Sequence, residues 1–133
     1  MTAQVVTITE GYSGEYLPLK KVKWAWTTDS SGGAIVDSTT AGEVNKTTAK
    51  YSGFVFSFIT DPGAAAPTDN YDVTILDDDG YDVLRGAGAD RDTSTTEYLA
   101  ASSINGCMLD SQLRLNIANA GNSKNGVIVL YIM

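Results

Sequence analysis

Acidic side chains form the densest group of possible metal ligands in this chain. Asp77, Asp78 and Asp79 are consecutive and are followed by Gly80. Such a run suggests calcium, which prefers carboxylate oxygens. A helix–loop–helix calcium site would also need an oxygen ligand in place of Ile75 and a glutamate at the end of the loop, and this spacing is missing. The run instead predicts an acidic turn between two strands.

A glycine-rich segment follows at Gly86–Asp90, with the composition of a phosphate loop or of a calcium-binding glycine repeat. It lacks the Gly-Lys-Ser/Thr ending of a phosphate loop, precedes no helical pattern and occurs once. The segment therefore predicts a loop without a bound ligand.

Other candidates for catalysis are few. The chain has no histidine, which excludes catalytic triads and imidazole bases. Its 16 acidic residues leave open a pair of carboxylates for glycoside hydrolysis. Trp24 and Trp26 share one face of a strand and could stack on a sugar, although such pairs more often lie in a core. We expect a protein that is not an enzyme and that uses no cofactor and no metal.

Length and charge limit the class of protein. The 133 residues predict one domain, and the net charge of −7 makes a nucleic-acid partner improbable, because phosphate backbones require clustered cations. One basic cluster contains Lys20, Lys21 and Lys23. Lys21 and Lys23 alternate with Val22 and Trp24, which predicts the solvent face of a strand, and a contact with an acidic partner is the alternative.

The chain shows no targeting or membrane signal. Its N-terminus lacks the basic and apolar segments of a secretory signal, and its longest apolar run, Val127–Met133, is too short to span a membrane. Cys107 is the one cysteine, so no intrachain disulfide forms, and we expect a small inert side chain near a loop. We expect a soluble protein made in the cytoplasm.

Alternation of apolar and polar residues predicts an all-β fold: a single-domain antiparallel β-sandwich, similar to a jelly roll. Ser52–Thr60 and Val127–Met133 are apolar on both faces, which indicates a central position or a face covered by a neighbouring subunit. The expected strands are Val5–Thr9, Leu19–Thr27, Ala34–Ser38, Ser52–Thr60, Tyr71–Leu76, Asp82–Arg85, Gln112–Ala118 and Val127–Met133.

Inward-facing positions of these strands define the expected core. It combines Trp24 or Trp26 with the following residues: Phe54, Phe56, Phe58, Tyr71, Val73, Ile75, Leu113, Leu115 and Ile117.

The connections are rich in turn-forming residues. Asp29–Gly33 and Asp61–Asn70 predict a turn and a loop, and Asn119–Gly126 a hairpin loop with positive φ at Asn125 and Gly126. Glu97–Ser103 fits either a helical turn or an edge strand. Three segments are expected to be flexible arms: Met1–Pro18 ahead of a sandwich at residues 19–133, Thr39–Lys50 (an edge strand or a loop) and Gly86–Thr96.

Several turn motifs occur in a fixed order along most of the chain. They are Trp26–Gly32 (WTTDSSG), Thr60–Thr74 (TDPGAAAPTDNYDVT), Asp77–Leu84 (DDDGYDVL), Gly86–Asp92 (GAGADRD) and Asn119–Gly126 (NAGNSKNG) before an apolar strand. In this order the motifs resemble a family of small virion proteins that tailed bacteriophages encode near their head genes. One departure is that Ile117 occupies, slightly displaced, a leucine position of the last motif.

The resemblance implies a capsid decoration (cement) protein on the outer capsid surface, bound across subunits of the major capsid protein. Separately, the two-sided apolar character of Ser52–Thr60 and Val127–Met133 predicts self-association, with a homotrimer slightly preferred over a dimer. The alternatives are a head–tail or tail accessory protein, or a carbohydrate- or receptor-binding module that stacks sugars on tryptophans or tyrosines. The residues expected to bind the capsid are Tyr12, Tyr16, Leu17, Arg85 and Arg91.

Overall fold

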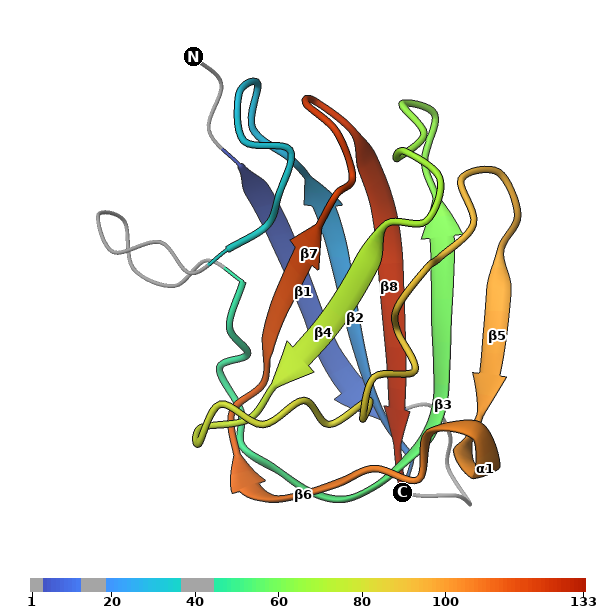
Figure 1. Ribbon diagram of the computed structural model, residues 1–133. Coiled ribbons are helices and arrows are strands. Elements are labelled where there is room, and N and C mark those ends of the chain that lie inside the picture. The colour runs from blue at the N-terminus through green and yellow to red at the C-terminus, as the bar shows by residue number, and fades with distance from the viewer. Residues whose placement is uncertain (1–3, 13–18, 37–44) are drawn as a thin grey trace.

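The protein is built from antiparallel strands. The computed structural model describes residues 4–12, 19–36 and 45–133. The elements within these ranges, shown in Figure 1, are β1 (Val5–Tyr12), β2 (Lys20–Thr27), β3 (Tyr51–Pro62), β4 (Asp72–Leu76), β5 (Glu97–Ala100), α1 (Ala101–Ile104), β6 (Cys107–Ser111), β7 (Arg114–Ala118) and β8 (Asn125–Ile132).

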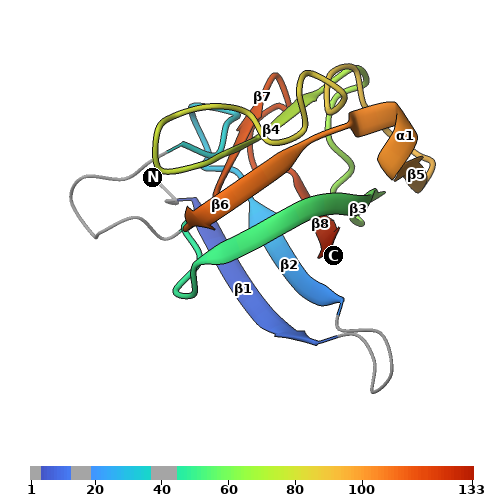
Figure 2. The same ribbon diagram turned by 90° about the horizontal axis from the view of Figure 1, so that it is seen from below.

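Two sheets pack face to face. The larger sheet has the strand order β1-β2-β8-β3-β5, with β6 paired to β3, and the smaller sheet consists of β4 and β7. Figure 2 shows these two layers from below, with β4 and β7 on one side and β1 and β2 on the other. Every pairing is antiparallel, so the predicted all-β, single-domain antiparallel fold is confirmed.

The core lies between the sheets and follows the alternation of their strands. β2 contributes Val22, Trp24 and Trp26, all buried, while Lys21 and Lys23 on either side of Val22 point away from the core. β8 lies between β2 and β3, as its two apolar faces predicted, and buries every second residue. The smaller sheet contributes the predicted set of Tyr71, Val73, Ile75, Leu113, Leu115 and Ile117.

The expected burial of Phe54 and Phe56 is wrong. In β3, Val55 pairs with Ile132 and Ser57 with Tyr131, so the register shifts and one extra residue, Phe56, lies between the two pairs. This β-bulge reverses the alternation. Val55 and Phe58 therefore both face the core, whereas Phe54 and Phe56 are exposed.

The N-terminal strand is longer than predicted. β1 pairs with β2 in continuous register from Val5 to Tyr12, so Gly11 and Tyr12 belong to the sheet and not to an irregular arm. Val6 and Ile8 pack against the core. Residues 5–12 of the expected flexible arm are therefore part of the sandwich, and their removal would uncover β2.

The expected return strand Asp82–Arg85 is wrong. Asp82 makes one bridge with Leu76, after which the chain turns. The Asp82 carboxylate accepts hydrogen bonds from the backbone N–H groups of Ile75, Leu84 and Gly86 at 3.1, 3.0 and 2.9 Å. These bonds replace the ladder that a second strand would form.

The expected flexible arm at Gly86–Thr96 is instead hydrogen-bonded along the edge of β4. Val73 N–H donates to the Gly88 carbonyl at 2.8 Å, and Arg91 N–H donates to the Tyr71 carbonyl at 2.7 Å. The segment thus covers the outer edge of the smaller sheet.

Two further segments border the opposite edge of that sheet. Ile35, in the expected strand Ala34–Ser38, makes a single bridge with Ile117. Lys46 bridges Arg114, and the neighbouring Asn45 and Thr47 are buried. Residues 37–44 of the two expected segments lie outside the described residues.

Three further predictions concern Glu97–Ser103, the Asn125–Gly126 turn and Cys107. Glu97–Ser103 forms both expected structures in succession, with β5 leading into α1. The predicted positive φ at Asn125 and Gly126 is wrong, because both lie in β8 and the positive φ values occur at Asn119, Gly121 and Ser123. Cys107 is exposed and not a filler, since the pairing of β6 turns Met108 inward instead.

The bulge predicts opposite effects for two neighbouring phenylalanines. Phe58→Ala should lower the free energy of unfolding by about 3–5 kcal/mol, because Phe58 is fully buried. Phe56→Ala should cost about 1 kcal/mol or less, because this side chain is exposed. Urea unfolding of both variants measures the difference, and equal losses would contradict the assigned register.

Tyr71 predicts a loss of stability in alkali. Burial raises the pKa of Tyr71 from 10.0 to about 12, the hydroxyl of Thr60 partly opposes this, and the Glu97 carboxylate adds to it. Above pH 10 the unfolded chain releases this proton before the folded chain does. Stability from Tyr71 is therefore present below pH 10 and is lost as the pH rises towards 12.

Tyr71→Phe isolates this contribution from the other titrating groups. Between neutral pH and pH 11, the free energy of unfolding should fall more in the natural protein than in this variant, as followed by urea unfolding at each pH. Equal falls would show that the Tyr71 hydroxyl does not contribute.

Candidate interaction surface

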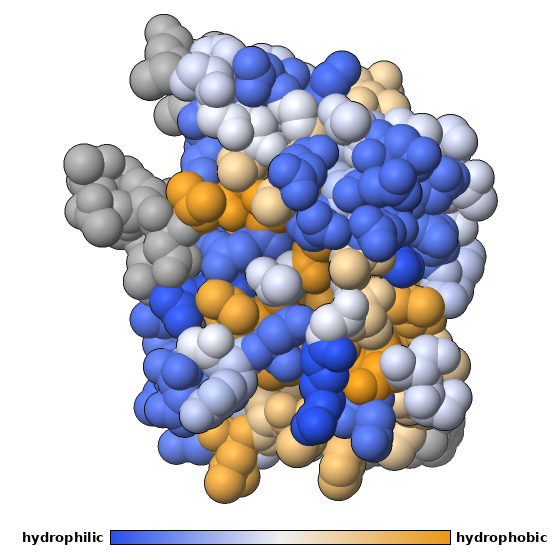
Figure 3. All heavy atoms as spheres, in the orientation of Figure 1, coloured by the Kyte–Doolittle hydropathy of each residue, from blue (hydrophilic) through white to orange (hydrophobic). Residues whose placement is uncertain are grey.

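Large apolar side chains gather without cover at one end of the larger sheet. Phe54, Phe56, Leu109 and Met133 are 69%, 42%, 83% and 52% exposed, and we call them the β3–β6 patch. Figure 3 shows apolar atoms at the lower rim of the molecule, where β6 and the C-terminus lie in Figure 1. Exposed apolar groups of this size are typical of surfaces that bind another macromolecule.

Strand pairing holds the patch together. Phe54 and Met133 exchange two backbone hydrogen bonds of 2.9 Å, and Phe54 also pairs with Cys107 in β6. Residues opposite each other in antiparallel strands point to the same face, so these three side chains are neighbours. Leu109 lies two residues beyond Cys107 and shares its outward direction.

Gly53 leaves room for the backbone of Met133 to pair with β3. Its φ is +137°, and a Cβ atom there would lie 2.3 Å from the carbonyl oxygen of Met133. No larger residue fits without displacing this backbone. The glycine therefore fixes the approach of Met133 to Phe54.

Aromatic residues continue the apolar surface along the outer face of the sheet. Tyr98 in β5 is exposed and pairs with Ile59, while Tyr131 in β8 pairs with Ser57. The ammonium group of Lys21 lies 5.8 Å from the centroid of the Tyr131 ring, a cation–π distance. The outer face is therefore apolar over β3, β5 and β8 and basic over β2.

Of the five expected capsid-binding residues, the structure describes the side chains of two, Arg85 and Arg91. Tyr12 ends β1, and its side chain lies outside the described residues, as do Tyr16 and Leu17. Arg85 is exposed in a turn, with φ of +53°. Arg91 is mostly buried, pairs with Glu97 at 3.6 Å and donates from Nε and one terminal nitrogen to the Ala89 carbonyl at 3.1 Å. Arg91 thus has a structural role.

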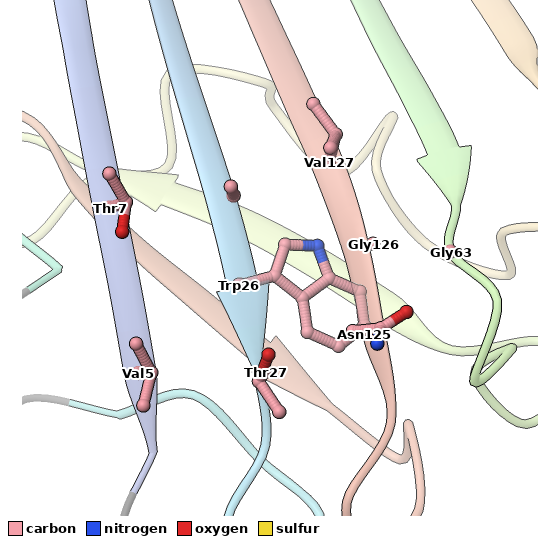
Figure 4. Close-up of a pocket in the computed structure, with 9 residues that line it drawn as sticks. Val5, Thr7, Trp26, Thr27, Gly63, Asn125, Gly126 and Val127 are labelled. Carbon is pink, nitrogen blue, oxygen red and sulfur yellow. The ribbon is translucent and has the colours of Figure 1, made fainter.

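The tryptophans are unavailable as sugar platforms, because both are buried. Trp24 Nε1 donates to the Asn45 carbonyl at 3.1 Å. Trp26 lies beneath Gly126, where a Cβ atom would be 2.9 Å from the indole. A shallow hollow of about 300 Å³ lies beside this ring, between β1, β2 and β8. Figure 4 shows residues that line it together with Trp26: Val5, Thr7, Thr27, Gly63, Asn125, Gly126 and Val127.

Two of the three carboxylates of the acidic turn accept hydrogen bonds from the chain itself. Asp77 accepts hydrogen bonds from the backbone N–H groups of Asp79 and Tyr81, both at 2.9 Å, which closes the predicted turn. Asp78 accepts from the N–H of Gln112 at 3.4 Å. Across residues 4–12, 19–36 and 45–133, no group of three acidic or cysteine side chains is placed to hold a metal ion.

None of the helices in the described part of the chain has the length and apolar character that crossing a bilayer requires.

Comparison with known proteins adds no relative. No protein-family model, no curated protein and no solved structure matches this chain.

Sequence reasoning missed most of the β3–β6 patch. The two-sided apolar pattern of Ser52–Thr60 did indicate a face for a neighbouring subunit. However, Phe54 and Phe56 were expected in the core, and the bulge places them on the exposed face. Leu109 lacked any signal, because its exposure follows from the pairing of β6 with β3. Met133 became part of the patch through its backbone bonds to Phe54.

Burial of both tryptophans predicts weak quenching of the protein's fluorescence by iodide. The folded protein should be quenched much less than the protein in concentrated urea, because iodide cannot reach an indole in the core. Equal quenching in both states would contradict this position of Trp24 and Trp26.

Proposed function

We propose that this chain is a non-enzymatic structural protein of a bacteriophage particle. It acts as a decoration protein that binds the assembled capsid across major capsid protein subunits. The ordered turn motifs from Trp26 to Gly126 support this proposal through their resemblance to small virion proteins.

The β3–β6 patch is the observation that carries the proposal. A chain with a net charge of −7 leaves two phenylalanines, a leucine and a methionine uncovered side by side. Aromatic residues and methionine are enriched at the centres of protein interfaces, where their burial supplies most of the binding energy. A protein partner that covers this patch therefore explains its composition.

The proposed attachment differs from the one expected from sequence. The capsid-binding residues expected from the sequence include Tyr12 and Arg91, which lie in two of the segments expected to be flexible arms. Because β1 is an integral strand and Arg91 is used internally, we assign attachment to the side chains of the patch. The rigid sandwich then presents them as a preformed surface, which lowers the entropic cost of binding.

Binding of this kind stabilises the partner by mass action. A protein that binds the assembled shell, and not its dissociated subunits, shifts the equilibrium towards the shell. No chemical reaction is needed for this effect.

Two serine substitutions test the role of the patch. Phe54→Ser combined with Phe56→Ser should reduce attachment to purified, expanded heads by at least about tenfold, since two interface aromatics are lost. Folding should persist, because both side chains are exposed. Tyr81→Ser is the matched control: it removes an exposed aromatic from the turn after β4 and should leave attachment unchanged.

Attachment is measured by sedimenting heads with added protein and quantifying the bound copies. Full occupancy by the double variant would refute attachment through the patch. Mass spectrometry of heads and tails, separated from the particle that this chain belongs to, tests the location itself. Recovery with tails alone would favour the tail accessory alternative.

A further inference from the structure

The larger sheet has one long edge without a described backbone partner. β1 and β5 are its end strands, and β5 has only four residues before α1 begins. Across the described ranges, the backbone of β1 bonds to β2 and to no other segment. Every second residue of an edge strand directs its N–H and C=O away from the sheet, where another strand can pair with them.

Both edges of the smaller sheet are covered by the chain itself. The outer edge of β4 bonds to Gly88 and Arg91, as described above. The outer edge of β7 bonds to Ile35 in both directions at 2.9 Å, and Leu115 N–H donates to the Asn45 carbonyl at 3.1 Å. Among the described strands, β1 therefore differs from β4 and β7.

β1 lacks the devices that usually block an edge strand. Its sequence, VVTITEGY, contains no proline and no lysine, and its first five residues are β-branched. Its register with β2 has no bulge, unlike the pairings of β3. The edge is therefore regular over its whole length.

The contacts of β1 with the rest of the chain come from its inner face. Glu10 accepts hydrogen bonds from Thr48 N–H and Ala49 N–H at 3.1 Å and from the Tyr51 hydroxyl at 2.6 Å. The side chain of Gln4, which lies an even number of residues from Glu10 and so on the same face, exchanges two hydrogen bonds with the backbone of Val36. These contacts also turn the one charge of β1 towards its own chain.

We propose that β1 pairs with β1 of a second copy of this chain, antiparallel and about a twofold axis. To pair along its whole length, the edge of β1 requires another strand of eight residues with an unpaired edge, and β1 of a second copy is such a strand. In a register centred on Ile8, Thr7 lies opposite Thr9 of the other copy, and Glu10 lies opposite Val6. Threonine pairs are favourable across strands, and no like charges meet.

This pairing joins the two larger sheets into one continuous sheet. It does not depend on the proposed function, and it gives a dimer in place of the slightly preferred trimer of the sequence analysis. Because each copy carries a net charge of −7, long-range repulsion opposes pairing, so the dimer should become tighter as salt screens these charges.

Sedimentation equilibrium of the full chain tests the pairing. The natural protein should reach twice the chain mass with rising concentration. Thr7→Lys with Thr9→Lys should raise the dissociation constant at least about tenfold, because like charges then face each other across the edge. Thr27→Lys, on the same face of the sheet but one strand inward, is the control and should leave the dissociation constant unchanged.

Cross-linking tests the register. In a Cys107→Ser background, Thr7→Cys with Thr9→Cys should form an intermolecular disulfide under mild oxidation, because opposed residues lie within bonding range. A chain that stays monomeric without cross-linking would refute the proposal. So would a trimer, or a dimer unaffected by the two lysines, since another surface would then hold the copies together.

Discussion

The surface of this protein depends on one extra residue in β3. The bulge at Phe56 reverses the alternation of the strand, so that Val55 and Phe58 both enter the core while Phe54 and Phe56 stay outside. A regular strand would have buried all three phenylalanines on one face. The same strand therefore stabilises the sandwich through one half and presents an apolar surface through the other.

The larger sheet carries two surfaces of different chemistry, and each is the basis of one proposal. The β3–β6 patch offers side chains, whose burial is driven by the hydrophobic effect. The edge of β1 offers backbone hydrogen bonds, which require a partner in extended conformation. The two surfaces are separated by β2 and β8 in the strand order, so a second copy at β1 leaves the patch open to a different partner.

Local patterns predicted the strands whose alternation is unbroken. β2, β4 and β7 expose polar residues on one face and bury Trp24, Val73 or Leu115 on the other, as their sequences indicated. Prediction failed where a side chain replaced the backbone ladder, as Asp82 does, or where a bulge changed parity. Neither feature has a periodic signal, because each depends on hydrogen bonds to residues in other strands.

The sequence by itself determined the all-β class, the antiparallel arrangement and most of the core, since these follow from period-two alternation and turn residues. It also determined the acidic charge and the absence of histidine chemistry. Only the tertiary structure decided which side of β3 is exposed and where Leu109 and Met133 lie. The physical reason is that exposure and edge position are properties of strand pairing, which joins residues far apart in the chain.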